Sequence, residues 1–133
     1  MKLLLISDKE CPALWDYYQP GRLKGVDMIL SCGDLSSKYL SFLVTMGGMP
    51  LVYVHGNHDK TYGQNPPEGC DCAEDRILRV KGLRLLGLGG SYLYSGGPHQ
   101  YTERQMESRI RRLRFQLWRS GGVDIVLAHS PIR

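Results

Sequence analysis

Four polar side chains in this sequence each follow an apolar run, at the position where a buried strand would end. They are Asp8, Asp34, Asn57 and His129, which follow residues 2–6, 26–30, 51–54 and 123–128. In an open α/β sheet, the residues just beyond the carboxyl ends of the strands converge on one edge, where ligands bind. One such residue alone is more often solvated or a helix cap. Their shared location predicts a site that combines carboxylate, amide and imidazole groups.

The residues around these positions indicate which chemistry this edge could perform. Asp34 follows a glycine in Ser31-Cys32-Gly33-Asp34, where the backbone can turn sharply and approach an ion. Gly56-Asn57-His58-Asp59 supplies a carbonyl ligand, an imidazole and a carboxylate that can orient that imidazole. Asp8-Lys9-Glu10 adds two carboxylates on alternate residues. Oxygen donors mixed with imidazole suit manganese, iron(II), magnesium or zinc.

The length and composition predict one globular domain over residues 1–133. A chain of 133 residues with 42% hydrophobic and 23% charged residues can bury a core of its own. Disordered, collagen-like and disulfide-rich proteins are excluded by this composition. The apolar run Leu3–Ile6 is too short for a membrane helix or a signal peptide, so we expect a cytoplasmic protein.

Apolar runs alternate with helix-like stretches along the chain, which predicts an α/β fold. We expect buried strands over residues 2–6, 26–30, 51–54 and 123–128, and a hairpin formed by 76–80 and 83–88. Helices are predicted over 12–19, after Ser36 or Ser37, and after Thr102, where Thr102-x-x-Gln105 fits a capping box. Residues 60–75 and 89–101 are expected to be loops.

Several other features admit a structural interpretation, which we prefer. Four cysteines, at positions 11, 32, 70 and 72, lack zinc-site spacing and are expected to be reduced. Gly87-x-Gly89-Gly90 predicts a tight loop, since Tyr92 replaces the last glycine of a dinucleotide motif. His55, His99, Trp15 and Trp118 are expected to pack or lie in loops, and the arginines of helix 103–119 are expected to form a solvated face.

The order of the motifs resembles the calcineurin-like metallophosphoesterase family. The resemblance rests on Ile6-Ser7-Asp8, Gly33-Asp34, Gly56-Asn57-His58-Asp59 and Ala128-His129, and runs over nearly the whole chain. It implies a β-sandwich flanked by helices and a dinuclear metal site. Asp34 would bridge the two ions, with Asp8 on one side and Asn57 and His129 on the other. His58, oriented by Asp59, would stabilise the transferring phosphoryl group or protonate the leaving oxygen.

The sequence departs from the family pattern in two places. Glu10 stands where the family usually has a histidine, and a carboxylate ligand there favours manganese or magnesium over zinc. The family also places a further histidine and a Gly-His-x-His motif after the segment that matches His129, and neither occurs before Arg133. The resemblance therefore implies a domain that is incomplete at its C-terminus, with missing metal ligands and impaired activity.

These observations predict a metal-dependent phosphoesterase that hydrolyses a phosphomonoester or phosphodiester with two divalent ions, manganese being favoured. The expected partners are this phosphoester substrate and either a second copy of the chain or a separate C-terminal segment. No association with a membrane is expected. One alternative is a non-catalytic remnant or binding module that keeps the fold and a partial metal site. Another is a small nucleic-acid-binding protein that uses its arginine face, which the net charge of +4 does not favour.

Overall fold

The structure, a computed structural model, describes the chain except residues 12–13, 15–18, 57–66, 93–99 and 130–133. Its first sheet is parallel throughout and has the strand order β1-β2-β3-β4. The strands are β1 (Leu3–Ile6), β2 (Met28–Ser31), β3 (Leu51–Tyr53) and β4 (Asp71–Cys72). The parallel order places the carboxyl ends of β1, β2 and β3 at one edge, as predicted.

A second sheet has the order β5-β6-β9. Its strands are β5 (Ile77–Val80), β6 (Leu83–Leu88) and β9 (Ile125–Ala128). The predicted hairpin is confirmed, since β5 and β6 pair in antiparallel register from Val80 opposite Leu83 to Ile77 opposite Leu86. The strand β9 is parallel to β6, so its carboxyl end also points to the edge where β6 ends. Two short strands, β7 (Ser91–Tyr92) and β8 (Gln100–Tyr101), form a separate pair.

Both helices begin at the caps that the sequence predicts. In α1 (Ser37–Gly47) the Ser36 hydroxyl accepts a hydrogen bond from the Tyr39 amide. In α2 (Glu103–Ser120) the Thr102 and Gln105 side chains form the complete capping box. Each helix ends at a glycine in the left-handed conformation, Gly48 or Gly121, which closes the last turn without the steric cost of a Cβ.

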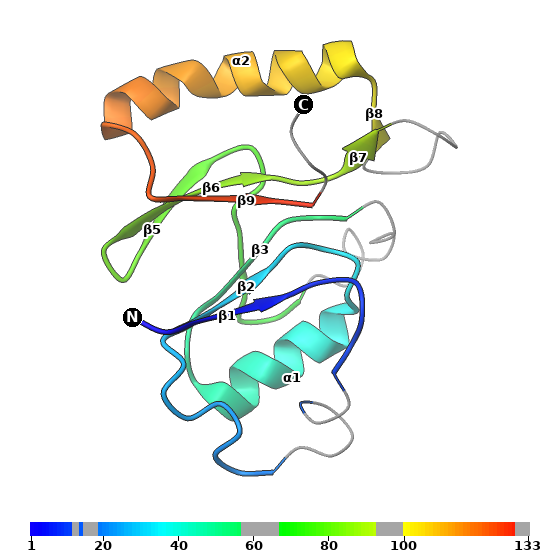
Figure 1. Ribbon diagram of the computed structural model, residues 1–133, viewed down its shortest axis with the longest axis vertical. Coiled ribbons are helices and arrows are strands. Elements are labelled where there is room, and N and C mark those ends of the chain that lie inside the picture. Colours follow the sequence, from blue (N-terminus) through cyan, green and yellow to red (C-terminus); the bar gives the residue numbers. More distant parts are fainter. Residues whose placement is uncertain (12–13, 15–18, 57–66, 93–99, 130–133) are drawn as a thin grey trace.

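The two sheets lie between the two helices, which gives four layers (Figure 1). Successive residues of β2 alternate between two cores: Ile29 packs on the α1 side, whereas Met28 and Leu30 face the second sheet. Leu85 and Leu127 complete the core between the sheets. A strand covered on both faces must be apolar at every position, which explains the uninterrupted run in β2. A third cluster joins α2 to β6.

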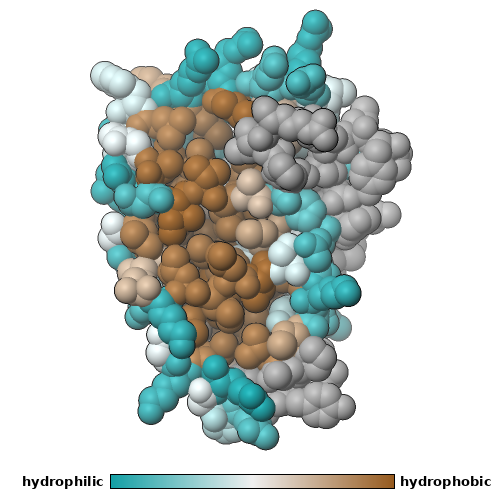
Figure 2. Space-filling view, in the orientation of Figure 1, coloured by the Kyte–Doolittle hydropathy of each residue, from teal (hydrophilic) through white to brown (hydrophobic). Residues whose placement is uncertain are grey.

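The edge strands are less buried than the sequence suggested. Leu5 in β1 is 66% exposed and Val126 in β9 is 48% exposed, although both lie in runs that we expected to be fully buried. The reason is topological, since β1 and β9 are the last strands of their sheets. Figure 2 shows the resulting apolar face in the middle of the molecule, where these two strands lie in Figure 1.

Two further expectations need correction or cannot be compared. Residues 60–75 are not entirely a loop, because β4 adds to the first sheet by pairing with β3. The helix expected over 12–19 falls mostly outside the described residues. No helix in the described part of the chain is long and apolar enough to cross a membrane.

Candidate metal centre

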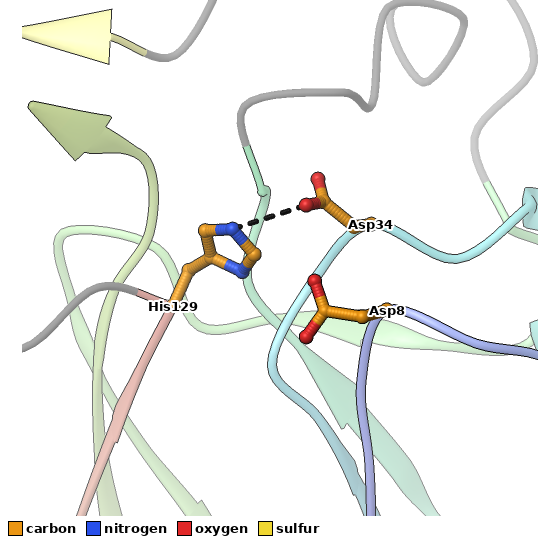
Figure 3. A group of neighbouring side chains, drawn as sticks. All are labelled: Asp8, Asp34 and His129. Carbon is orange, nitrogen blue, oxygen red and sulfur yellow. Dashed lines mark ion pairs between the residues drawn. The ribbon is translucent and has the colours of Figure 1, made fainter. Parts of the chain in front are cut away.

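Three of the predicted ligands meet at the common edge of the two sheets. Asp8 follows β1, Asp34 follows β2 and His129 follows β9, and each offers a ligand atom within 4.8 Å of the others (Figure 3). Asp8 is exposed, whereas Asp34 and His129 are largely buried, with side chains 10% and 9% exposed. We call these three residues the strand-end group. Asp8 and His129 are 121 positions apart in the sequence, and the packing of the two sheets brings them together.

The backbone turns sharply at both carboxylates. Asp8 and Asp34 have φ values of 65° and 61°, in the left-handed region that is uncommon for residues other than glycine, asparagine and aspartate. The Asp8 amide donates a hydrogen bond of 3.2 Å to the Gly33 carbonyl, which ties the two turns together. These turns direct both side chains back over the sheet edge instead of along the strands. Such strained positions are concentrated at functional sites.

Two glycines allow the loops to pack closely around Asp34. A Cβ on Gly33, which has a φ of 102°, would overlap the Gly56 backbone. A Cβ on Gly56 would overlap the Asp34 carboxylate and backbone amide. The glycines of both sequence motifs are therefore required by close approach, which sets the depth at which the Asp34 carboxylate lies.

The hydrogen bonds of His129 define which of its ring nitrogens can bind a cation. Nδ1 lies 2.7 Å from the Cys32 carbonyl oxygen, which can only accept, so Nδ1 carries the proton and donates it. In the neutral ring, Nε2 is then an acceptor, and it lies 3.1 Å from Oδ2 of Asp34. Two acceptors at this distance require a cation between or beside them, either a proton or a metal ion. A backbone carbonyl that fixes the histidine ring is the usual arrangement behind a metal ligand.

The Cys32 thiol is not among the ligand atoms of the strand-end group. Burial, and secondarily the negative charge of Asp8, raises the pKa of the Cys32 thiol. A neutral thiol is a poor metal ligand, since the thiolate is the form that binds. All four cysteines are free, in line with the expected reduced state.

Glu10 lies beside the helix α1 and is not part of the strand-end group. Its Oε1 accepts a hydrogen bond of 2.7 Å from the hydroxyl of Ser36, the N-cap of α1. A carboxylate at this position complements the positive end of the helix dipole. The ligand role that we predicted for Glu10 stays a prediction. Asn57, His58 and Asp59 lie outside the described residues, so their predicted roles stay predictions as well.

Sequence reasoning missed a polar cluster at the base of α2. The side chains of His55, Glu74, Asp75 and Arg109 form this cluster, which we call the Arg109 network. Nδ1 of His55 lies 2.7 Å from Oε2 of Glu74. Arg109 is only 5% exposed, lies 2.8 Å from the Asp75 carboxylate and 3.8 Å from that of Glu74, and stacks over the Tyr101 ring at 4.1 Å.

The prediction that the arginines of this helix are solvated is therefore wrong for Arg109. A signal was present in the sequence, because Arg109 is three residues after Met106 and four before Leu113, at the border of the apolar stripe. The network connects α2 to the segment that follows β3. The Gly90 amide adds a hydrogen bond of 2.7 Å to the His55 carbonyl, immediately before Gly56.

Comparison with known proteins agrees with this geometry. The sequence matches the family model for calcineurin-like phosphoesterases over residues 1–133. No curated protein matches the chain. Since the match covers the whole sequence, including the three strand ends that carry the strand-end group, the chain belongs to the calcineurin-like phosphoesterase family.

Proposed function

We propose that this chain is a single metallophosphoesterase domain over residues 1–133 that hydrolyses a phosphomonoester or phosphodiester with the help of two divalent cations. The observation that carries the proposal is the convergence of Nε2 of His129 and Oδ2 of Asp34, 3.1 Å apart, with the Asp8 carboxylate beside them. Family membership supplies the class of substrate. The layered arrangement of the two sheets is in keeping with the β-sandwich that the family resemblance implies.

Each residue of the strand-end group has a distinct role in this proposal. Asp34 has two carboxylate oxygens within reach of the other two residues, so it is the residue that would serve both cations. Asp8 would hold one of the cations and His129 the other, and the Cys32 carbonyl, 2.7 Å from Nδ1, fixes the His129 ring so that Nε2 faces Asp34. When bound, a pair of cations lowers the pKa of a water molecule and offsets the charge of a phosphoryl group.

The donor set favours manganese. Carboxylates and one imidazole are ligands that manganese, iron and magnesium accept, and the Cys32 thiol is not part of the strand-end group. Asn57 and Glu10 are proposed as further ligands. His58 and Asp59 are proposed to face the phosphoryl group, where an imidazole held by a carboxylate can deliver a proton to the leaving oxygen.

The test is metal binding, measured by titration calorimetry and by the electron paramagnetic resonance of manganese. We expect the wild type to bind Mn²⁺ and Asp34→Asn to bind it at least about tenfold more weakly, equivalent to about 1.4 kcal/mol. Asp71→Asn is the matched control, because Asp71 is an exposed carboxylate in β4. Equal affinity of the wild type and Asp34→Asn would reject the proposed centre.

Activity is the second measurement. Hydrolysis of a chromogenic phosphodiester should depend on added manganese and should be lost in Asp34→Asn but not in Asp71→Asn. Manganese binding without any hydrolysis would favour the alternative of a metal-binding module that performs no catalysis.

A further inference from the structure

The positive charge of this protein is concentrated in one element. Six of the 17 basic residues and two of the 13 acidic residues lie in α2, so the remaining eleven basic and eleven acidic residues balance. The whole net charge of +4 therefore belongs to this helix. A net charge that is modest on average becomes a strong local field when a single 18-residue helix carries all of it.

The charge is displayed on the outer side of the helix. The opposite side packs on the second sheet through Met106, Ile110, Leu113 and Leu117. Positions three and four apart share a helix face, and the face turned away from the sheet forms one line. We call this line the outer stripe; it consists of Arg104, Arg111, Arg112, Phe115, Trp118 and Arg119. In Figure 2, hydrophilic side chains project along the upper edge of the molecule, where Figure 1 places α2.

All six side chains of the outer stripe are exposed. Trp118 is 79% exposed and Phe115 is 63% exposed, with ring centroids 6.1 Å apart. The expectation that Trp118 packs against the protein is wrong. Among the described residues, the ion pairs formed by α2 involve Arg109 alone, and the helix itself carries two carboxylates, Glu103 and Glu107, beside its six arginines.

A hollow beside the N-terminal half of the helix extends this surface. It has a volume of about 350 Å³ and is lined by Tyr101, Arg104, Gln105, Ser108, Arg109 and Arg112. Among the described residues, its lining contains three arginines and no carboxylate. Arg109 is held by its internal contacts, but the guanidinium groups of Arg104 and Arg112 and the Ser108 hydroxyl can donate to an anion, and a phosphate group is small enough to enter.

We propose that the outer stripe and this hollow bind the phosphate backbone of a single-stranded nucleic acid. Planar guanidinium groups donate two parallel hydrogen bonds to phosphate oxygens. Exposed aromatic rings provide surfaces on which unpaired bases stack. From Arg104 to Arg119 the helix extends roughly 22 Å, at about 1.5 Å per residue, which is enough to contact several nucleotides.

A membrane surface is less compatible with this helix. A helix that lies in a membrane interface inserts an apolar face into the lipid. Here the apolar face of α2 already packs on the second sheet, and Phe115 and Trp118 stand among arginines. The proposal does not depend on the metal centre, so binding is expected in the presence of EDTA.

The test is fluorescence anisotropy of a labelled oligothymidylate in EDTA. We expect the logarithm of the association constant to fall linearly with the logarithm of the salt concentration. The slope should be about −3, for four phosphates contacted by arginine. That slope corresponds to a loss of affinity of roughly 50-fold between 50 and 200 mM salt. The triple variant Arg104→Gln, Arg111→Gln, Arg112→Gln should reduce the slope by about 2.

The control variant removes the same charge elsewhere. Arg22, Lys24 and Lys38 are exposed and lie outside α2, so changing all three to glutamine should leave affinity within about threefold of the wild type. Trp118→Ala should weaken binding about fivefold or more with an unchanged salt slope, because it removes stacking and no charge. Thermal unfolding followed by circular dichroism should show that each variant has a Tm close to that of the wild type, because the substituted positions are exposed.

Three outcomes would overturn the proposal. The first is equal weakening by the two triple variants, which would mean that only the total charge matters. The second is equally tight binding of the same probe annealed to its complement, with no effect of Trp118→Ala. The third is binding to phosphatidylserine vesicles, with a blue shift of tryptophan fluorescence, and none to the oligonucleotide.

Discussion

Two histidines of this protein each have Nδ1 at hydrogen-bond distance from an oxygen atom, but the charged groups around them differ. Nδ1 of His129 lies 2.7 Å from the Cys32 carbonyl, and Nδ1 of His55 lies 2.7 Å from the Glu74 carboxylate. Around His55 the negative charges of Glu74 and Asp75 are matched by Arg109. Around His129 the Asp34 and Asp8 carboxylates converge.

The difference between these regions is a difference in how charge is balanced. The Arg109 network contains its own cation, so it stabilises the contact between α2 and the sheets without any ligand. In the strand-end group two carboxylates and an imidazole converge, and in the proposed function a cation from solution balances their charge.

The largest expected effect comes from removing the internal cation. Arg109→Met should lower the free energy of unfolding by about 3 kcal/mol or more, because it removes a buried guanidinium that pairs with Asp75 at 2.8 Å and lies 3.8 Å from the Glu74 carboxylate. Chemical denaturation measures this change. Arg104→Met, at an exposed position of the same helix, should change stability by less than about 0.5 kcal/mol. Similar losses in both variants would show that the Arg109 network contributes no more than an exposed arginine.

Adding the external cation should have the next largest effect. At a Mn²⁺ concentration of 100 times the Kd, the wild type should gain about 2.7 kcal/mol in the free energy of unfolding, and Asp34→Asn should gain far less. In EDTA, Asp34→Asn should be at least as stable as the wild type, because an amide can donate to Nε2 of His129. Destabilisation of this variant in EDTA would instead identify Asp34 and His129 as a structural ion pair.

Gly56 lies against the strand-end group and Gly89 against the Arg109 network, so the same substitution by alanine can be made beside each. A Cβ on Gly56 would overlap the Asp34 carboxylate, and one on Gly89 would overlap the Glu74 carboxylate and the His55 backbone. Both Gly56→Ala and Gly89→Ala should cost about 1–3 kcal/mol of stability through overpacking. Only Gly56→Ala should also weaken manganese binding measured by calorimetry. Loss of manganese affinity in Gly89→Ala would show that the two regions are coupled.

The smallest effect is expected for an ion pair on the surface. Nη2 of Arg84 lies 3.1 Å from the Asp124 carboxylate, and hydrogen bonding to Arg84 lowers the pKa of Asp124 below its ordinary 3.8. A lowered pKa stabilises the folded state above the unfolded value, and this contribution disappears as pH falls through the folded value. The difference in Tm between the wild type and Asp124→Asn should be small at pH 7 and vanish below pH 3.8. A difference that grows in acid would contradict this assignment.

The local structure was well predicted where residue types act on their immediate neighbours. The hairpin of β5 and β6 and the Thr102 capping box were found because turns and caps depend on residues a few positions apart. The edge strands were predicted less well. The apolar runs of β1 and β2 look alike in sequence, yet Leu5 is exposed and Leu30 is buried, since strand order decides which runs are covered.

The same division holds for the candidate site. The sequence by itself determined the family and the polar residues that follow the strands, because glycine and aspartate at these turns are recognisable without a structure. Only the tertiary structure brought Asp8, Asp34 and His129 within 4.8 Å, directed Glu10 to the cap of α1 and buried Arg109 between two carboxylates. Distances between side chains far apart in the chain depend on how two sheets and two helices pack, and that packing is a property of the whole core.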